Sequence, residues 1–437
     1  MATTLSTSST RWQRLVHHPA SLPAVYILLT VAATVVQFLK SSNLPYTNYN
    51  NYIIFRNAFY HLLQGQDMYI LHLVEQYDLY KYSPTFALLM GPFAVLPNFI
   101  GLLGWNALNA AALYWAVQQL PTIDVRARRV VLWLSAIELL TSMQNAQSNG
   151  LVAGLIIGGA VALERARPSR AALWLLLSVF VKLFGLVAFV LFWLYPRQRV
   201  RFVLWSVGLG IVLALLPLVV VPPAELLAQY QSWGVMLTAD HSASFGLSVM
   251  GWLETWFGFL PPKTAVVLVG ALLFCLPLLR FKQYQHAAFR TGLLAAVLLW
   301  VVVFNHKAES PTFVIAVAGV GLWWSLQPSR RWPDLLLLFS VVLFTVLSPT
   351  DLFPRFLRKA YVVPYVLKAV PCIFVWARLT YELLTRNFAP SLLLLLPKQL
   401  LRRFQLPLFP SSLCPRIRSI IDEAGQVWSG GRFRGSR

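Results

Sequence analysis

Long apolar segments alternate with short polar segments along most of the chain. The apolar segments cover residues 22–39, 83–97, 99–119, 130–143, 149–164, 171–195, 201–221, 264–279, 290–304, 311–327, 333–347 and 360–384. As helices, segments of roughly 15–25 residues match the thickness of a bilayer, whereas membrane β-barrels show short segments of alternating polarity. The pattern predicts an all-α polytopic membrane protein with about 11–13 transmembrane or partly spanning helices.

Two of these segments do not have the pattern of a single spanning helix. Segment 83–97 is short and carries Pro84, Pro92 and Pro97, so we expect it to dip into the membrane and return. Segment 171–195 holds Lys182 and Gly185 near its middle, so we expect two short helices that break there. With both adjustments, all the basic loops fall on one side of the membrane.

Basic residues determine the predicted orientation. They gather in the loops at 126–129, 165–170, 197–201, 280–290 and 329–331, and again in the tail. Because Lys and Arg are enriched on the cytoplasmic side of helical membrane proteins, we predict a cytoplasmic N-terminus (1–21), a transmembrane domain (22–385) and a basic cytoplasmic tail (386–437). The outer loops are then 40–82, 222–263, 305–310 and 348–359.

The composition agrees with a membrane protein. Of the 437 residues, 58% are hydrophobic and only 12% are charged, about half the charged fraction of a soluble domain. The net charge of +21 is explained by the basic loops and tail, so we predict no nucleic-acid partner. The three cysteines lack the spacing of metal ligands, and we predict neither a metal nor a cofactor.

The outer loops also contain candidate amphipathic helices. Tyr52, Phe55, Phe59 and Leu62 recur at helical spacing. This helix either lies in the membrane interface or packs on the transmembrane core, and both interpretations stay open. Loop 222–263 is similar, with several aromatic residues suited to the interface.

Four polar groups are the candidates for chemistry. They are Asn50–Asn51 with Asp67, Glu75, Asp78, Lys81 and Tyr82; Asn305, His306, Lys307 and Glu309; Asp351, Arg355, Arg358 and Lys359; and Lys182. Purely structural interpretations stay open for each of them. Lys182 could snorkel or form an ion pair, His306–Glu309 could be a loop ion pair or a helix cap, and Asp351–Arg355 could be a helical i,i+4 pair.

This set of side chains suits one reaction in particular. Cations and an imidazole can hold a phosphate, and a nearby carboxylate can deprotonate a hydroxyl group. An adjacent amphipathic helix can dock a long lipid tail. The combination favours glycosyl transfer from a lipid-phosphate sugar, and the sequence contains no P-loop, HExxH or GxSxG motif.

Residues 50–115 resemble glycosyltransferase family 87. The shared motifs, in order, are Gly65-x-Asp67-x-Tyr69, Tyr82-x-Pro84, Leu96-Pro97 and Trp105-x-x-x-Asn109, and QNAQSNGLVAGL (144–155) and the Lys182 segment are also similar. The resemblance implies a GT-C fold with its active site on the extracytoplasmic face of the cell (inner) membrane. It further implies a polyprenyl-phosphate sugar donor, often mannose, and metal-independent inverting transfer.

The resemblance also suggests roles for individual residues. The family base is an aspartate just after the first span, but this chain has Asn51 there, and an amide cannot act as a base. We therefore predict Asp78 or Glu75 as the base. We predict that His306, which matches a family histidine, holds the donor phosphate with Lys307, Lys182 and Arg355. Asn51, Asp67, Glu309 and Asp351 are predicted to orient substrate.

The leading hypothesis is an integral-membrane hexosyltransferase of the cell envelope. It would move mannose from a polyprenyl-phosphate donor to a glycan or glycolipid acceptor, with membrane lipids as further partners. One alternative is a transporter or flippase of lipid-linked sugars, which would carry charges through the bilayer midplane; Lys182 and Glu138 are the few candidates for such charges. A catalytically inactive relative, because of Asn51, and a non-enzymatic scaffold also stay open.

Overall fold

The computed structural model describes residues 18–41, 47–239, 244–260 and 262–389. The chain divides into two units, Met1–Arg386 and Asn387–Arg437. Nearly all of the predicted cytoplasmic tail and of the predicted cytoplasmic N-terminus lies outside the described residues.

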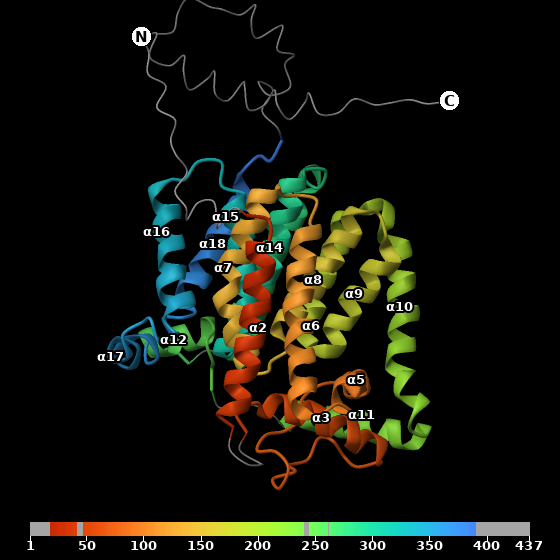
Figure 1. Cartoon of the computed structure of the whole chain (residues 1–437). Coiled ribbons are helices and arrows are strands. Elements are labelled where there is room, and N and C mark those ends of the chain that lie inside the picture. Colours follow the sequence, from red (N-terminus) through yellow and green to blue (C-terminus); the bar gives the residue numbers. More distant parts are fainter. Residues whose placement is uncertain (1–17, 42–46, 240–243, 261, 390–437) are drawn as a thin grey trace, which may run out of the picture. The chain divides into compact units, whose positions relative to one another are not determined.

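Within the described residues, all regular structure is helical, as predicted. The helices that run along the bundle in Figure 1 are α2 (Ser21–Leu39), α6 (Asn98–Gln119), α7 (Val125–Gln144), α8 (Asn149–Glu164), α9 (Pro168–Val181), α10 (Arg199–Leu215), α14 (Ala287–Val303), α15 (Phe313–Ser325), α16 (Trp332–Ser340) and α18 (Val370–Thr385). In the part of the chain that the structure describes, three stretches are long and apolar enough to cross a membrane: α2, α6 and the continuous helical stretch Pro196–Val219 around α10. Seven shorter apolar helices accompany them.

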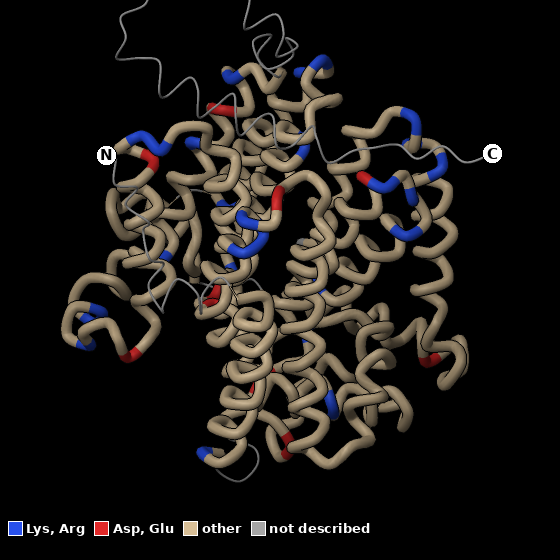
Figure 2. Tube along the Cα trace, turned by 45° about the horizontal axis from the view of Figure 1, so that its top comes forward, with Lys and Arg blue, Asp and Glu red and all other residues tan. Residues whose placement is uncertain are grey.

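The basic loops lie together at one end of the bundle, which we call the basic end (Figure 2). Hydrogen bonds join these loops: Arg165 donates to Gln119, Arg290 pairs with Glu164, and Arg386 donates to the Leu326 carbonyl. The prediction that these loops share one side agrees with this arrangement.

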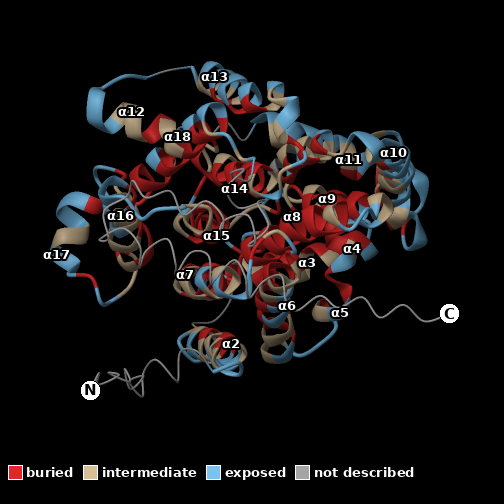
Figure 3. Ribbon diagram, turned by 90° about the horizontal axis from the view of Figure 1, so that it is seen from above, coloured by how far each residue is buried: buried red, intermediate tan, exposed pale blue. Residues whose placement is uncertain are grey.

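The centre of the bundle and its outside are both apolar. Almost every residue of α8, α14 and α15 is buried, and these helices occupy the middle of the end-on view in Figure 3. Large apolar side chains such as Ile27, Leu204 and Leu272 are exposed on α2, α10 and α13 (Lys263–Cys275). Such surfaces are unfavourable in water, so they fit a lipid environment.

Neither of the two irregular segments forms a single helix, and the expected break near Lys182–Gly185 is present. Segment 83–97 forms α4 (Pro84–Leu89) and α5 (Gly91–Ala94), each too short to cross a bilayer. Segment 171–195 forms α9, an extended residue at Lys182 (φ −145°, ψ 123°) and the 3₁₀ helix η1 (Leu183–Leu194). The close return depends on Gly185, because a Cβ there would collide with the Ser178 hydroxyl and lie 2.8 Å from its carbonyl carbon.

One apolar segment is interrupted where a continuous helix was expected. In segment 360–384, α18 begins only at Val370, after the short helix α17 (Arg355–Leu357), the π-helical turn Arg358–Val362 and a stretch of turns. Pro364 lies in those turns and lacks the N–H that a continuing helix needs.

Three helices run across the bundle instead of along it: α3 (Asn50–Leu63), α11 (Pro223–Ala239) and α12 (Val249–Phe257) (Figure 1). On α3, Tyr52, Phe55 and Leu62 are fully buried. Of the two open interpretations of this helix, the structure therefore supports packing on the transmembrane core.

Candidate functional site

A cavity of about 610 Å³ opens beside the loop that joins α14 to α15. Its walls come from this loop, from residues 244–247, from α12 and from the turns before α18. The charged side chains and the imidazole that line it are Lys81, Glu254, His306, Lys307 and Glu309. Three predicted site residues, His306, Lys307 and Glu309, thus line one cavity in an otherwise apolar protein.

The loop that carries His306 is fixed by its own backbone. Asn305 accepts a hydrogen bond from the Lys307 N–H through its side chain (3.0 Å), and the Leu247 N–H donates to the Ala308 carbonyl (2.9 Å). Gly246 has a φ of +57°, and a Cβ there would lie 2.5 Å from the His306 carbonyl oxygen. Only glycine fits this approach.

Glu309 and Thr312 form a reciprocal capping box that begins the turn Ser310–Thr312 and leads into α15. Of the interpretations left open for His306–Glu309, the helix cap is therefore confirmed for Glu309. Glu309 is also one of the residues that line the cavity.

A buried ion pair lies behind this loop. Lys368 Nζ contacts both carboxylate oxygens of Glu138 on α7 (2.9 and 3.0 Å) and donates to Ser310 Oγ (2.8 Å). The pairing of Lys368 with Glu138 was not predicted from the sequence. The available signal was that opposite charges in apolar segments usually pair, although nothing in the sequence indicates which charges are partners.

Lys182 lies in a pocket of amides. Its Nζ is 2.7 Å from Asn149 Oδ1 and 3.1 Å from Gln147 Oε1, and it lies 5.8 Å from the centre of the Tyr82 ring. The charge of Glu309 also acts on Lys182. Lys182 therefore belongs electrostatically to the same site as the cavity loop.

The turn that supplies these amides is held by the Trp105 and Asn109 motif. The Trp105 indole donates to the Ala146 carbonyl (2.9 Å), and the Asn109 carboxamide oxygen accepts from the Leu151 N–H (2.9 Å). Asn51 donates to the Asn145 carbonyl (2.8 Å) in the same turn. The Trp105–Asn109 motif and the segment 144–155, both part of the family resemblance, thus meet beside Lys182.

Two carboxylates lie close enough to Tyr82 for their charges to affect it. Burial raises the pKa of the Tyr82 phenol above its ordinary value, and the charges of Glu309 and Asp78 raise it further. Asp78 also pairs with Lys81 (3.3 Å), and both side chains are close to half exposed. Asp78 is thus not itself in the cavity lining, but its partner Lys81 is.

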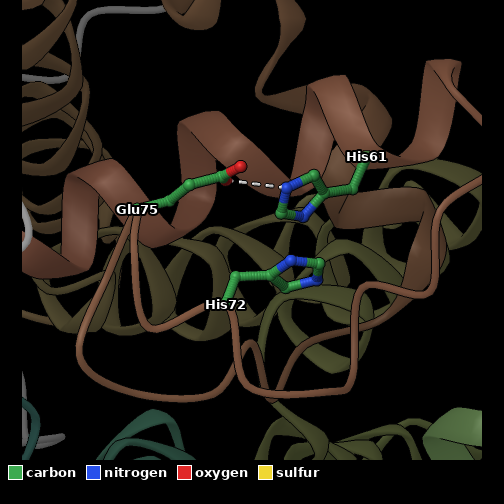
Figure 4. Close-up of side chains that lie close together, drawn as sticks. All are labelled: His61, His72 and Glu75. Carbon is green, nitrogen blue, oxygen red and sulfur yellow. Dashed lines mark hydrogen bonds and ion pairs between the residues drawn. The ribbon is translucent and has the colours of Figure 1, made fainter.

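The other predicted residues lie outside the cavity lining. Glu75 accepts from His61 Nε2 at 2.9 Å (Figure 4), and Asp67 accepts from the Ser232 hydroxyl at 2.7 Å. Asp351 and Arg355 form a surface i,i+4 pair whose side chains are 84% and 74% exposed. The structure does not bring this pair to the cavity.

The chemistry available here is anion binding beside a carboxylate. Two lysines and an imidazole line the cavity, and Lys182 lies behind Tyr82. Such groups can stabilise a phosphate, and Asp78 or Glu309 can accept a proton.

Comparison with known proteins gives a family. No curated protein matches the chain. Residues 80–305, just over half of the chain, match the sequence model of glycosyltransferase family 87. The matched region includes Tyr82, Lys182 and the Trp105–Asn109 motif. This chain is therefore a member of glycosyltransferase family 87, a family of membrane glycosyltransferases.

Proposed function

We propose that this protein transfers a hexose, specifically mannose, from a polyprenyl-phosphate donor to a glycan or glycolipid acceptor outside the cytoplasm. The observation that carries the proposal is the cavity lined by Lys81, His306, Lys307 and Glu309, with the half-buried Lys182 close enough to Glu309 for their charges to interact. Family membership supports sugar transfer, and the apolar outer surface supports a donor with a lipid tail.

In this proposal, cations hold the donor phosphate. His306 and Lys307 contact its oxygens from the cavity, while Lys182 adds a positive charge at the amide pocket. These charges stabilise the polyprenyl phosphate as the bond from sugar C1 to the phosphate oxygen breaks. Arg355 has no part in this arrangement because its exposed pair lies outside the cavity lining.

A carboxylate then takes the acceptor proton. We assign this role to Asp78 in preference to Glu75, because Asp78 pairs with cavity-lining Lys81 whereas Glu75 is hydrogen-bonded to His61. The acceptor oxygen attacks C1 from the face opposite the phosphate, so the configuration at C1 inverts. Glu309 is held by its capping box and orients the sugar hydroxyls.

The test uses full-length protein in nanodiscs, radiolabelled polyprenyl-phosphate mannose and a glycolipid extract as acceptor. We expect label in the acceptor, with a rate about 10²-fold lower in His306→Ala or Asp78→Asn. His286→Ala is the matched control, because this imidazole lies at the basic end, and it should retain full activity.

The proposal fails if well-folded protein transfers no sugar from any polyprenyl-phosphate donor, as an inactive relative would. It also fails if the protein moves the lipid-linked sugar across a bilayer without forming a new glycosidic bond, as a flippase would.

A further inference from the structure

A second polar cluster lies apart from the cavity, between α3 and the loop that follows it (Figure 4). His61 comes from the last turn of α3, and His72 and Glu75 come from the loop. One potential ligand atom from each residue lies within 4.8 Å of the other two. We propose that His61, His72 and Glu75 bind a zinc ion that fastens this loop to α3.

The ligand set fits zinc better than the alkaline-earth ions. Two imidazole nitrogens and one carboxylate oxygen are a common three-ligand zinc set, with a fourth position left for water. Calcium and magnesium prefer oxygen ligands alone. The mixed nitrogen and oxygen ligands therefore favour a transition metal of intermediate softness, such as zinc.

The second imidazole is already oriented as metal ligands usually are. His72 Nε2 lies 2.9 Å from the Asp67 carbonyl oxygen, which can only accept, so Nε2 carries the proton and Nδ1 keeps its lone pair. Metal-bound histidines typically donate their other N–H to a carbonyl or carboxylate in this way.

The carbonyl that orients His72 is itself held in place. The Asp67 side chain accepts from the Tyr69 N–H (2.8 Å) and from the Ser232 hydroxyl on α11 (2.7 Å). This outer shell fixes Asp67 and, through its carbonyl, the ring of His72. It also gives Asp67 a role that does not involve the sugar.

Metal binding requires one imidazole to turn out of its present stack, so that both rings aim a nitrogen lone pair at the ion. His61 and His72 stack with ring centres 3.9 Å apart, and His61 Nε2 shares a proton with Glu75 at 2.9 Å. Zinc bonds of about 2.0–2.1 Å require ligand atoms about 3.3 Å apart. The ion would take the place of the proton between His61 Nε2 and Glu75. The Glu75 side chain is half exposed, so it is free to move to the distance that zinc requires.

The experiment measures zinc binding to untagged full-length protein in detergent, without donor or acceptor. Competition with a fluorescent chelator should give one zinc per chain, and zinc but not magnesium should raise the melting temperature. Glu75→Gln and His72→Gln should each weaken zinc binding at least 10-fold and abolish the rise. His286→Gln should behave as wild type.

Glu75 lies on the surface, so Glu75→Gln should fold normally and the test does not depend on a core substitution. Absence of stoichiometric zinc in the wild type would overturn the proposal, as would unchanged zinc affinity in both ligand variants. Because no substrate is present, neither result depends on whether the protein transfers mannose.

Discussion

At the residue scale, burial separates the ion pairs that fix the structure from those that do not. The Lys368–Glu138 pair has side chains only 5% and 0% exposed, whereas the Arg355–Asp351 pair is almost fully exposed. Removing one partner of a buried pair leaves an uncompensated charge, but an exposed pair is screened by solvent.

Lys368→Met should therefore destabilise the protein strongly, by about 3–5 kcal/mol, measured as a fall in melting temperature in detergent. Arg355→Ala should leave the melting temperature almost unchanged. The double variant Glu138→Gln/Lys368→Met should recover part of the loss, because no unpaired charge remains. If Lys368→Met matched Arg355→Ala, the ion pair would not contribute to stability.

Asn51, which the resemblance places where the family keeps its base, has a structural role in this chain. Its amide donates to the Asn145 carbonyl in the turn that supplies Gln147 and Asn149 to Lys182. An ionised aspartate at this position has no proton to donate, so its carboxylate would lie against the Asn145 carbonyl oxygen without a hydrogen bond.

Asn51→Asp should thus lower stability by about 1–3 kcal/mol, and Asn51→Ala should lower it less, because alanine adds no charge. Thermal unfolding of the three proteins gives the order directly. A melting temperature of Asn51→Asp equal to or above that of wild type would exclude this role for the asparagine.

At the element scale, hydropathy predicted the helices well but not their partners. The long helices follow the apolar segments, and the break at Lys182–Gly185 was visible because a charge and a glycine interrupt an apolar segment. By contrast, Glu138 and Lys368 are 230 residues apart, and the cluster of His61 with His72 forms only because a loop folds back on α3. Such contacts depend on tertiary packing, which local periodicity does not encode.

The break between α9 and η1 should be sensitive to a single methyl group. Gly185→Ala would collide with Ser178 and displace the backbone next to Lys182, so we expect a loss of about 1–3 kcal/mol together with reduced transferase activity. Gly208→Ala on α10 is the matched control, since nothing lies within 4 Å of its added Cβ. Equal melting temperatures and rates in the two variants would contradict a tight return at Gly185.

At the scale of the whole molecule, the uneven distribution of charge predicts the orientation in the membrane. The basic loops of the described residues lie at one end of the bundle (Figure 2), away from α3 and α11. Because positive loops are retained in the cytoplasm, we expect the proposed site to face the opposite side of the membrane.

Cysteine labelling in intact cells tests this orientation. The three native cysteines are replaced by serine, and a single cysteine is introduced at Val74, which is 87% exposed in the loop after α3, or at Arg330 at the basic end. A membrane-impermeant maleimide should label Val74→Cys in intact cells and Arg330→Cys only after the cells are permeabilised. The reverse pattern would place the cavity on the cytoplasmic side. It would contradict both the predicted orientation and the proposed transfer outside the cytoplasm.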